Sequence, residues 1–136
     1  MAIRIYDTPY MIIDIQSETL LRALADSTRL RTVALLRSHG ELCVCELTEA
    51  LQISQPKLSR HLALLRNDQL LLARRSAQWV HYRINPALPD WAHALIGAAA
   101  TGLGEQTAID AKQLSRCLPD LPTCCPTAAT NKAETS

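Results

Sequence analysis

Apolar residues recur with helical spacing through the first half of the chain, and polar or glycine residues separate them into four stretches. Leu58, Leu62 and Leu65, for example, repeat at positions i, i+4 and i+7. Ser, Asp and Gly at the ends of the stretches supply caps and stops. The pattern predicts helices from about Ser17 to Ala25, from caps at Asp26 and Ser27 to Gly40, from Leu42 to Leu51, and from Gln55 to Asn67.

The last of these four helices has two unlike faces. At about 100° per residue, its three leucines gather on one side with His61 beside them. Ser59 and Arg60 fall on the opposite side, flanked by Gln55. Ser54 is a suitable N-cap, and Pro56 is tolerated in a first turn. We therefore expect this helix to bury its leucines and to present a polar face.

The second half of the chain begins with alternating residues that predict a two-stranded hairpin. Leu70–Arg75 and Trp79–Ile84 are the strands, and Ser76-Ala77-Gln78 is the turn. Pro86 and Pro89 open a last helical stretch, which continues into a run of small residues. From Pro119 onward Pro, Thr and Ala dominate. We expect an N-terminal extension (1–16), one folded domain (17–116), and a disordered tail (117–136) that carries cysteines.

Composition narrows the class of protein. The 136 residues are 48% hydrophobic with a formal net charge of +1, which is typical of one small domain. Only 4% of them are aromatic and none is Phe, so the core must be aliphatic, which favours helices. No apolar run has the length of roughly 18 to 20 residues that crosses a membrane, and no export signal is evident. Five cysteines, an odd number, then indicate a reduced cytoplasm rather than a disulfide framework.

The small net charge hides an uneven distribution along the chain. From Gln52 to Arg83 there are six basic residues and one acid, a local charge of +5. From Gly40 to Leu51 there are three acids and no basic residue, a local charge of −3. A basic stripe confined to one central segment is typical of local phosphate contacts.

The order of the predicted elements is that of a winged helix-turn-helix, a mainly helical fold with a β-hairpin wing. A short helix, a tight turn, a second helix with a polar face and then a basic hairpin follow one another. A polar helix face alone is more often simply solvated, but the order, the turn and the wing together favour DNA binding. The candidate DNA contacts are Ser54, Gln55, Lys57, Ser59, Arg60 and His61 on the helix, and Arg74, Arg75, Gln78 and Arg83 on the wing.

Four stretches carry a specific resemblance, namely LADSTRL from Leu24, ELCVCEL from Glu41, SQPKLSRHL from Ser54 and WVHYR from Trp79. Together and in this order, they resemble the ArsR family of metalloregulatory repressors, and within it the arsenic-responsive repressors. The resemblance covers about residues 17 to 100. It implies a homodimer packed through its first and last helices, an operator of double-stranded DNA, and release of that DNA when the inducer binds.

Cys43 and Cys45 are the candidate inducer ligands. Soft thiolates select soft, thiophilic acceptors, and trivalent arsenic or antimony takes three sulfurs. In a regular helix residues i and i+2 point about 200° apart, so chelation by this pair demands a distorted helix start. A lone C-x-C pair is a weak signal because cysteine is also a small core residue, but this pair opens the helix that supports the recognition helix.

The third ligand is an open question in the sequence. The relatives that this chain resembles most have a third cysteine three residues after the pair, where this chain has Thr48. A threonine cannot replace a thiolate. The alternatives are an external thiol such as glutathione, water, or one of Cys117, Cys124 and Cys125, which could also form a separate site or simply an exposed tail.

Other functions compete with arsenic sensing. A winged-helix repressor could instead sense zinc, cadmium or thiol oxidation, but the four histidines are scattered. A thiol oxidoreductase would need a C-x-x-C pair within a βαβ pattern, and neither is present. We therefore expect no enzyme and no catalytic cofactor.

Overall fold

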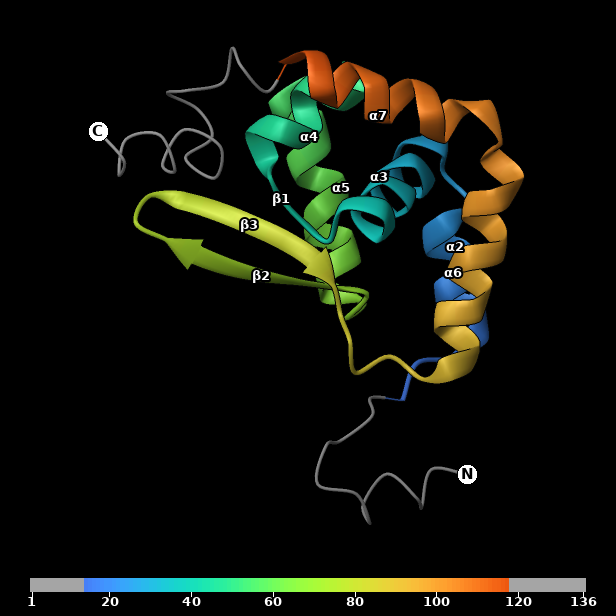
Figure 1. Cartoon of the computed structure of the whole chain (residues 1–136). Helices are drawn as coiled ribbons and strands as arrows, with labels where there is room; N and C mark the ends of the chain where they lie inside the picture. The colour runs from blue at the N-terminus through green and yellow to red at the C-terminus, as the bar shows by residue number, and fades with distance from the viewer. Residues whose placement is uncertain (1–13, 118–136) are drawn as a thin grey trace.

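The computed structural model describes residues 14–117, which form a group of helices and one small sheet whose hairpin projects to one side (Figure 1). In chain order the elements are α2 (Ser17–Leu24), α3 (Ser27–His39), β1 (Glu41–Cys43), α4 (Val44–Leu51), α5 (Gln55–Asn67), β2 (Leu71–Ser76), β3 (Trp79–Ile84), α6 (Asp90–Leu103) and α7 (Glu105–Cys117). Within this part of the chain, no helix is both long and apolar enough to span a bilayer. The predicted fold class, mainly helical with a hairpin wing, is confirmed.

Local capping explains where α3 begins and ends. The Asp26 carboxylate accepts hydrogen bonds from the amides of Thr28 at 2.8 Å and Arg29 at 3.2 Å, which satisfies two donors that the helix leaves open. Gly40 follows the last turn with φ of 85°, a conformation that glycine adopts without a steric cost. Both ends of this helix are as predicted, because the signals that set them are local.

The stretch predicted as one helix from Leu42 to Leu51 divides after Cys43, and the prediction is wrong for its first residues. They form β1, which pairs antiparallel with β3 in the register Glu41 to Arg83, Leu42 to Tyr82 and Cys43 to His81. The sheet therefore has three strands in the order β1-β3-β2. Apolar spacing near Leu42 fits a helix or a strand equally, and only the edge of β3 decides between them.

The hairpin itself is close to its prediction. Ser76, predicted to lie in the turn, is the last paired residue of β2 and lies opposite Trp79. Only Ala77 and Gln78 remain as the connection, and Ala77 has a positive φ of 58°. A two-residue connection with positive φ matches the right-handed twist of the paired strands.

Leucine fills the core, as the lack of phenylalanine predicts. The fully buried large side chains are Leu20, Val33, Leu35, Leu36, Leu47, Leu51, Leu58, Leu62, Leu65, Leu70, Leu71 and Leu114. They come from five helices and from the start of the hairpin, and Ala92 and Ile96 of α6 belong to the same aliphatic cluster.

The predicted last helical stretch consists of two helices. Gly104, with φ of 61°, ends α6 and allows the chain to turn sharply. The next helix, α7, then runs back over α3 and α4 (Figure 1). Leu114 anchors it in the core, with 2% of its surface exposed. The helix includes Cys117, whereas the rest of the predicted tail lies outside the described residues.

Candidate nucleic-acid interface and thiol site

The turn between α4 and α5 sets the direction of the candidate recognition helix. Gln52 adopts the left-handed conformation with φ of 56°, and the amide of Ile53 donates to the carbonyl oxygen of Thr48 at 3.3 Å. Ser54 then takes the N-cap position, as predicted. One face of α5 carries Leu58, Leu62 and Leu65, each with no exposed surface, and these leucines fix the helix on the core.

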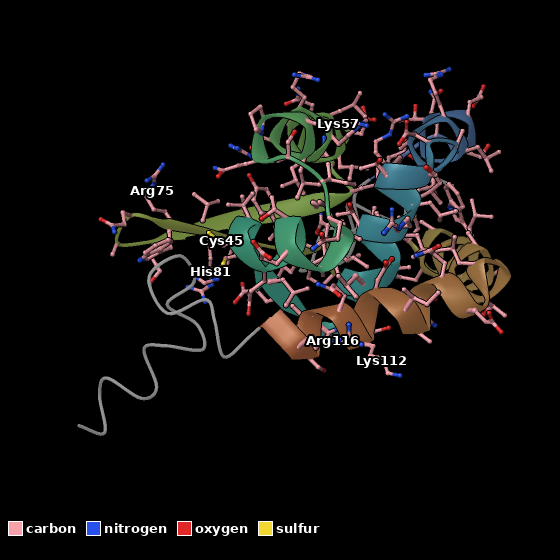
Figure 2. The ribbon with its side chains drawn as sticks, turned by 90° about the horizontal axis from the view of Figure 1, so that it is seen from above. Cys45, Lys57, Arg75, His81, Lys112 and Arg116 are labelled. Carbon is pink, nitrogen blue, oxygen red and sulfur yellow. The ribbon has the colours of Figure 1, made fainter. Side chains whose placement is uncertain are left out.

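The opposite face of α5 is open. The side chains of Gln55, Lys57, Ser59 and Arg60 are exposed, as is that of the N-cap residue Ser54. Figure 2 shows Lys57 on the same side of the molecule as Arg75 of the hairpin, whereas Lys112 and Arg116 of α7 lie on the other side. The structure thus brings the candidate helix contacts and the end of the wing to one basic surface, which we call the α5–wing surface.

His61 is tied into the fold. Its Nδ1 atom lies 3.2 Å from a terminal nitrogen of Arg29, whose Nε donates to the carbonyl oxygen of Ala23 at 2.7 Å. Because a guanidinium only donates, the Nδ1 atom acts as the acceptor here. This contact joins α5 to α3 and gives His61 a packing role, and its predicted DNA contact stays a prediction.

The four candidate residues of the wing occupy different places. Arg75 and Gln78 are exposed near the tip of the hairpin. Arg74 forms two hydrogen bonds with the Glu41 carboxylate, at 2.7 and 2.9 Å, which hold the pKa of Glu41 below its ordinary value. Arg83 lies opposite Glu41 at the other end of β3. The structure brings only Arg75 and Gln78 to the tip.

The two candidate thiol ligands lie where β1 passes into α4. Cys43 is the last residue of β1 and the N-cap of α4, with extended backbone angles, and 1% of its surface is exposed. Its amide donates to the Glu46 carboxylate at 2.9 Å. The helix therefore begins after Cys43, so the opposed directions expected for two residues within a regular helix do not apply to this pair.

The oxidation state of the two sulfurs differs. Cys43 is disulfide-bonded, whereas Cys45 is not. Thr48 donates its hydroxyl to the carbonyl oxygen of Cys45 at 2.9 Å, a bond within the helix. Across residues 14–117, no three His, Cys, Asp or Glu side chains are grouped as a metal site. Cys124 and Cys125 lie outside the described residues.

Two buried polar residues next to the thiols were missing from the predicted site. Burial raises the pKa of Glu46, although the hydrogen bond from Cys43 opposes this. His81 lies directly opposite Cys43 across the sheet and is 4% exposed, and burial lowers its pKa. The alternation of residues 79–84 could place His81 on a face of the hairpin, but only β1, which was not predicted, places Cys43 beside it.

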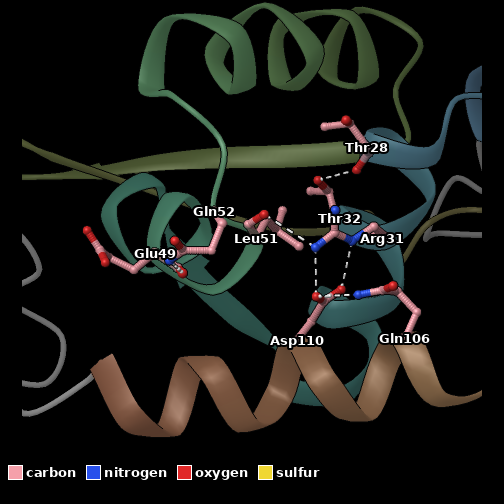
Figure 3. Close-up of polar contacts among 8 residues, drawn as sticks. All are labelled: Thr28, Arg31, Thr32, Glu49, Leu51, Gln52, Gln106 and Asp110. Atoms are coloured by element: carbon pink, nitrogen blue, oxygen red, sulfur yellow. Dashed lines mark hydrogen bonds and ion pairs between the residues drawn. The ribbon is translucent and has the colours of Figure 1, made fainter.

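A polar network also links α7 to the end of α4 (Figure 3). Arg31 of α3 donates to both carboxylate oxygens of Asp110, at 3.0 and 2.8 Å, and to the carbonyl oxygen of Leu51 at 3.3 Å. Gln106 donates to the same carboxylate at 3.0 Å. Asp110 is 2% exposed and the Arg31 side chain 22%, so the carboxylate of this pair is buried and the guanidinium is partly buried. Through the bond from Arg31 to the Leu51 carbonyl oxygen, the network holds the last residue of α4, just before the turn that leads to α5.

Comparisons with known proteins agree with this geometry. Residues 26–71 match the sequence profile described as "Bacterial regulatory protein, arsR family". The chain is 43% identical over 115 residues to the arsenic resistance transcriptional regulator ArsR1 of Pseudomonas putida, covering 85% of this chain and 90% of that protein. It is 58% identical over 80 residues to the arsenical resistance operon repressor of Escherichia coli, covering 59% and 68%. The solved AntR antimony-specific transcriptional repressor matches with a TM-score of 0.56 at 28% identity, covering 65% and 78%.

Proposed function

Because the chain belongs to the ArsR family of bacterial regulatory proteins, we propose that it is a cytoplasmic, homodimeric repressor of an arsenic-resistance operon. Its inducer is trivalent arsenic or antimony, bound by Cys43 and Cys45. The observation that carries the proposal is the position of this pair. The two cysteines lie at the start of α4, and the other end of α4 leads through three residues into α5.

Operator binding uses the α5–wing surface. The N-terminal residues of a recognition helix lie nearest the base edges of the major groove, which assigns base contacts to Gln55, Lys57, Ser59 and Arg60. Ser54 and the wing residues Arg74, Arg75, Gln78 and Arg83 contribute phosphate or minor-groove contacts. A dimer repeats this surface on two half-sites of the operator.

Because trivalent arsenic takes three sulfurs, the inducer site needs one sulfur besides those of Cys43 and Cys45. The third comes from Cys117, Cys124 or Cys125, the remaining cysteines of the sequence. This assignment keeps all three sulfurs on the chain, because Thr48 offers no thiolate. In the binding step, As(OH)3 loses three hydroxides, which take up the three thiol protons and leave as water, and arsenic remains trivalent. Cys43 must be reduced beforehand.

Binding of arsenic then alters the start of α4. Drawing the sulfurs of Cys43 and Cys45 onto one atom changes the backbone at the N-cap and disturbs the hydrogen bond between Cys43 and Glu46. The far end of α4 is bonded to the network of Arg31 and Asp110 through the Leu51 carbonyl oxygen. Movement of α4 therefore strains this bond and shifts the turn before α5. DNA and inducer thereby disfavour each other, with a coupling free energy of about 1 to 3 kcal/mol, or roughly 5- to 150-fold in affinity.

The experiment that tests the proposal follows the fluorescence anisotropy of a labelled promoter duplex while arsenite is titrated under reducing conditions. We expect release from the wild type and no release from Cys43→Ser/Cys45→Ser, although that variant should still bind the duplex. The matched control is Cys117→Ser/Cys124→Ser/Cys125→Ser, which should need more arsenite. Equal release from the wild type and from the Cys43/Cys45 variant would contradict the proposal.

Thiol oxidation is the second candidate signal, and the disulfide at Cys43 favours it. Formation of that bond in place of arsenic binding could equally alter the start of α4. The two signals differ in what reverses them, because a reductant reverses oxidation and a competing dithiol removes arsenic. DNA release by diamide in the absence of arsenite, reversed by a phosphine reductant, would establish the oxidative signal. Zinc and cadmium are tested in the same titration.

A further inference from the structure

A cavity of about 510 Å³ lies between the C-terminal end of α3, the base of the sheet and α6. This volume is within the range of about 300 to 1,000 Å³ that is typical of small-molecule sites. Arg37, Arg83 and His93 supply polar groups to its wall, and Leu36, Ile84 and Pro86 supply apolar surface. The cavity therefore suits a small organic molecule that carries a negative charge.

The arginines of this cavity, Arg37 and Arg83, form no salt bridge within the described residues, although Arg83 lies close enough to Glu41 to help lower the pKa of that carboxyl. Glu41 is the acidic residue of the wall, and both of its oxygens already accept hydrogen bonds from Arg74. Two guanidinium groups thus remain to bind an anion, and guanidinium matches a carboxylate in shape and charge.

A glycine makes room for one of these guanidinium groups. A Cβ atom at Gly97 of α6 would lie 2.9 Å from a terminal nitrogen of Arg37, which is closer than side chains pack. The missing side chain therefore lets the guanidinium of Arg37 lie against α6, beside the cavity wall that His93 forms.

The cavity also lies next to the thiol site. Glu41 and Arg83 line the cavity and face each other across the sheet, and Cys43 and His81 form the matching pair two residues along the strands. Residues two apart on a strand share a face and are about 6.6 Å apart. A molecule of a few carbon atoms in the cavity can therefore place a sulfur near Cys43.

We propose that this cavity binds the carboxylate of a low-molecular-weight thiol on which trivalent arsenic arrives. The inference rests on the proposed function and adds how the inducer reaches the site. One carboxylate of the complex binds Arg37 and Arg83, and the arsenic then passes to the chain by thiol exchange. Each exchange forms one bond from arsenic to a cysteine sulfur and breaks one to the carrier sulfur, which leaves with the cysteine proton. The arsenic stays trivalent throughout.

The test compares donors of arsenic and uses the full chain, kept reduced with a phosphine. Arsenic is supplied as its glutathione complex, as its 2-mercaptoethanol complex, or as free arsenite. Stopped-flow absorbance of the arsenic–sulfur bonds formed with the protein gives the transfer rates.

We expect Arg37→Gln to slow transfer from the glutathione complex about three- to tenfold, the scale of one charged contact. The other two donors should change less than twofold. Arg22→Gln, which removes an exposed charge on α2, is the matched control.

A second measurement separates binding from transfer. S-methylglutathione keeps the carboxylates but has no thiol, so it should slow transfer from the glutathione complex to the wild type and have less effect on Arg37→Gln. If Arg37→Gln slowed transfer from all three donors equally, or if S-methylglutathione did not compete, the proposed role of the cavity would be wrong. The proposed function would not be affected by either result. Absence of transfer from every donor to the wild type would overturn the proposed function as well.

Discussion

The two helices of the helix-turn-helix are held in opposite ways. The recognition helix α5 contacts the core through one row of leucines and leaves its other face exposed. In its neighbour α4, a hydrogen bond from the Cys43 amide to Glu46 caps the first turn, Arg31 holds the Leu51 carbonyl at the other end, and α7 packs against the helix. Substitutions on the outer face of α5 should therefore alter DNA binding without altering stability, whereas changes around α4 should alter both.

The largest expected effect is on the network that holds α4. Asp110→Ala leaves the Arg31 guanidinium without its buried carboxylate and should lower the free energy of unfolding by about 3 kcal/mol. Urea denaturation measures this change. Glu105→Ala removes an exposed carboxylate from the same helix and should stay within about 0.5 kcal/mol of the wild type. An equal cost for both variants would show that the network does not anchor α4.

The next effect belongs to the open face of α5. Arg60→Ala should weaken operator binding by about 1 to 3 kcal/mol, the scale of one base contact, and change stability by less than about 0.5 kcal/mol. Anisotropy titration and urea denaturation measure the two quantities. Arg66→Ala, at the far end of the same exposed surface, should weaken binding less. If Arg60→Ala destabilised the fold as much as Asp110→Ala, the contrast between the helices would be wrong.

A smaller effect is expected at Asp26, the N-cap of α3, which is the helix that contacts both α4 and α5. Partial burial raises the pKa of Asp26, but hydrogen bonds from the amides of Arg29 and Thr28 outweigh it and leave the pKa below its ordinary value of 3.8. The cap therefore stabilises the fold above that value and is lost as the pH falls through the lowered pKa. Asp26→Ala should cost about 1 kcal/mol at neutral pH and less near pH 3.

Asp26→Asn is the control for this prediction. Asparagine also caps helices but does not titrate, so this variant should keep most of the stability at neutral pH and lose the pH dependence. Urea denaturation at the two pH values provides the data. A cost of Asp26→Ala that did not fall on acidification would mean that the carboxylate charge is irrelevant to the cap.

The smallest effect is expected for the exposed ion pair between the sheet strands. Glu41→Gln removes a partner of Arg74, whose side chain is 57% exposed, so the loss of stability should be smaller than that of Asp110→Ala or Asp26→Ala. A double-mutant cycle with Arg74→Gln measures the pair alone. A coupling free energy as large as the effect of Asp110→Ala would remove the distinction between buried and exposed pairs.

Capping and periodicity predicted much of this molecule. The limits of α5 and the ends of α3 depend on residues within a few positions of each other, and those residues are where the sequence indicated them. The same reasoning extended α4 by two residues too many at its start. It also missed that α6 ends at Gly104 and the chain turns there, because a glycine among small residues is compatible with a continuing helix.

Local spacing was enough to predict the class of fold, the polar face of the recognition helix and the position of the two cysteines before it. Three further features became visible only in the folded chain: Cys43 lies opposite His81, α7 packs on α4, and Arg31 contacts Asp110. Arg31 and Asp110 are 79 positions apart in the chain. The physical reason is that such contacts depend on how separate elements pack, and no local pattern of residues records that packing.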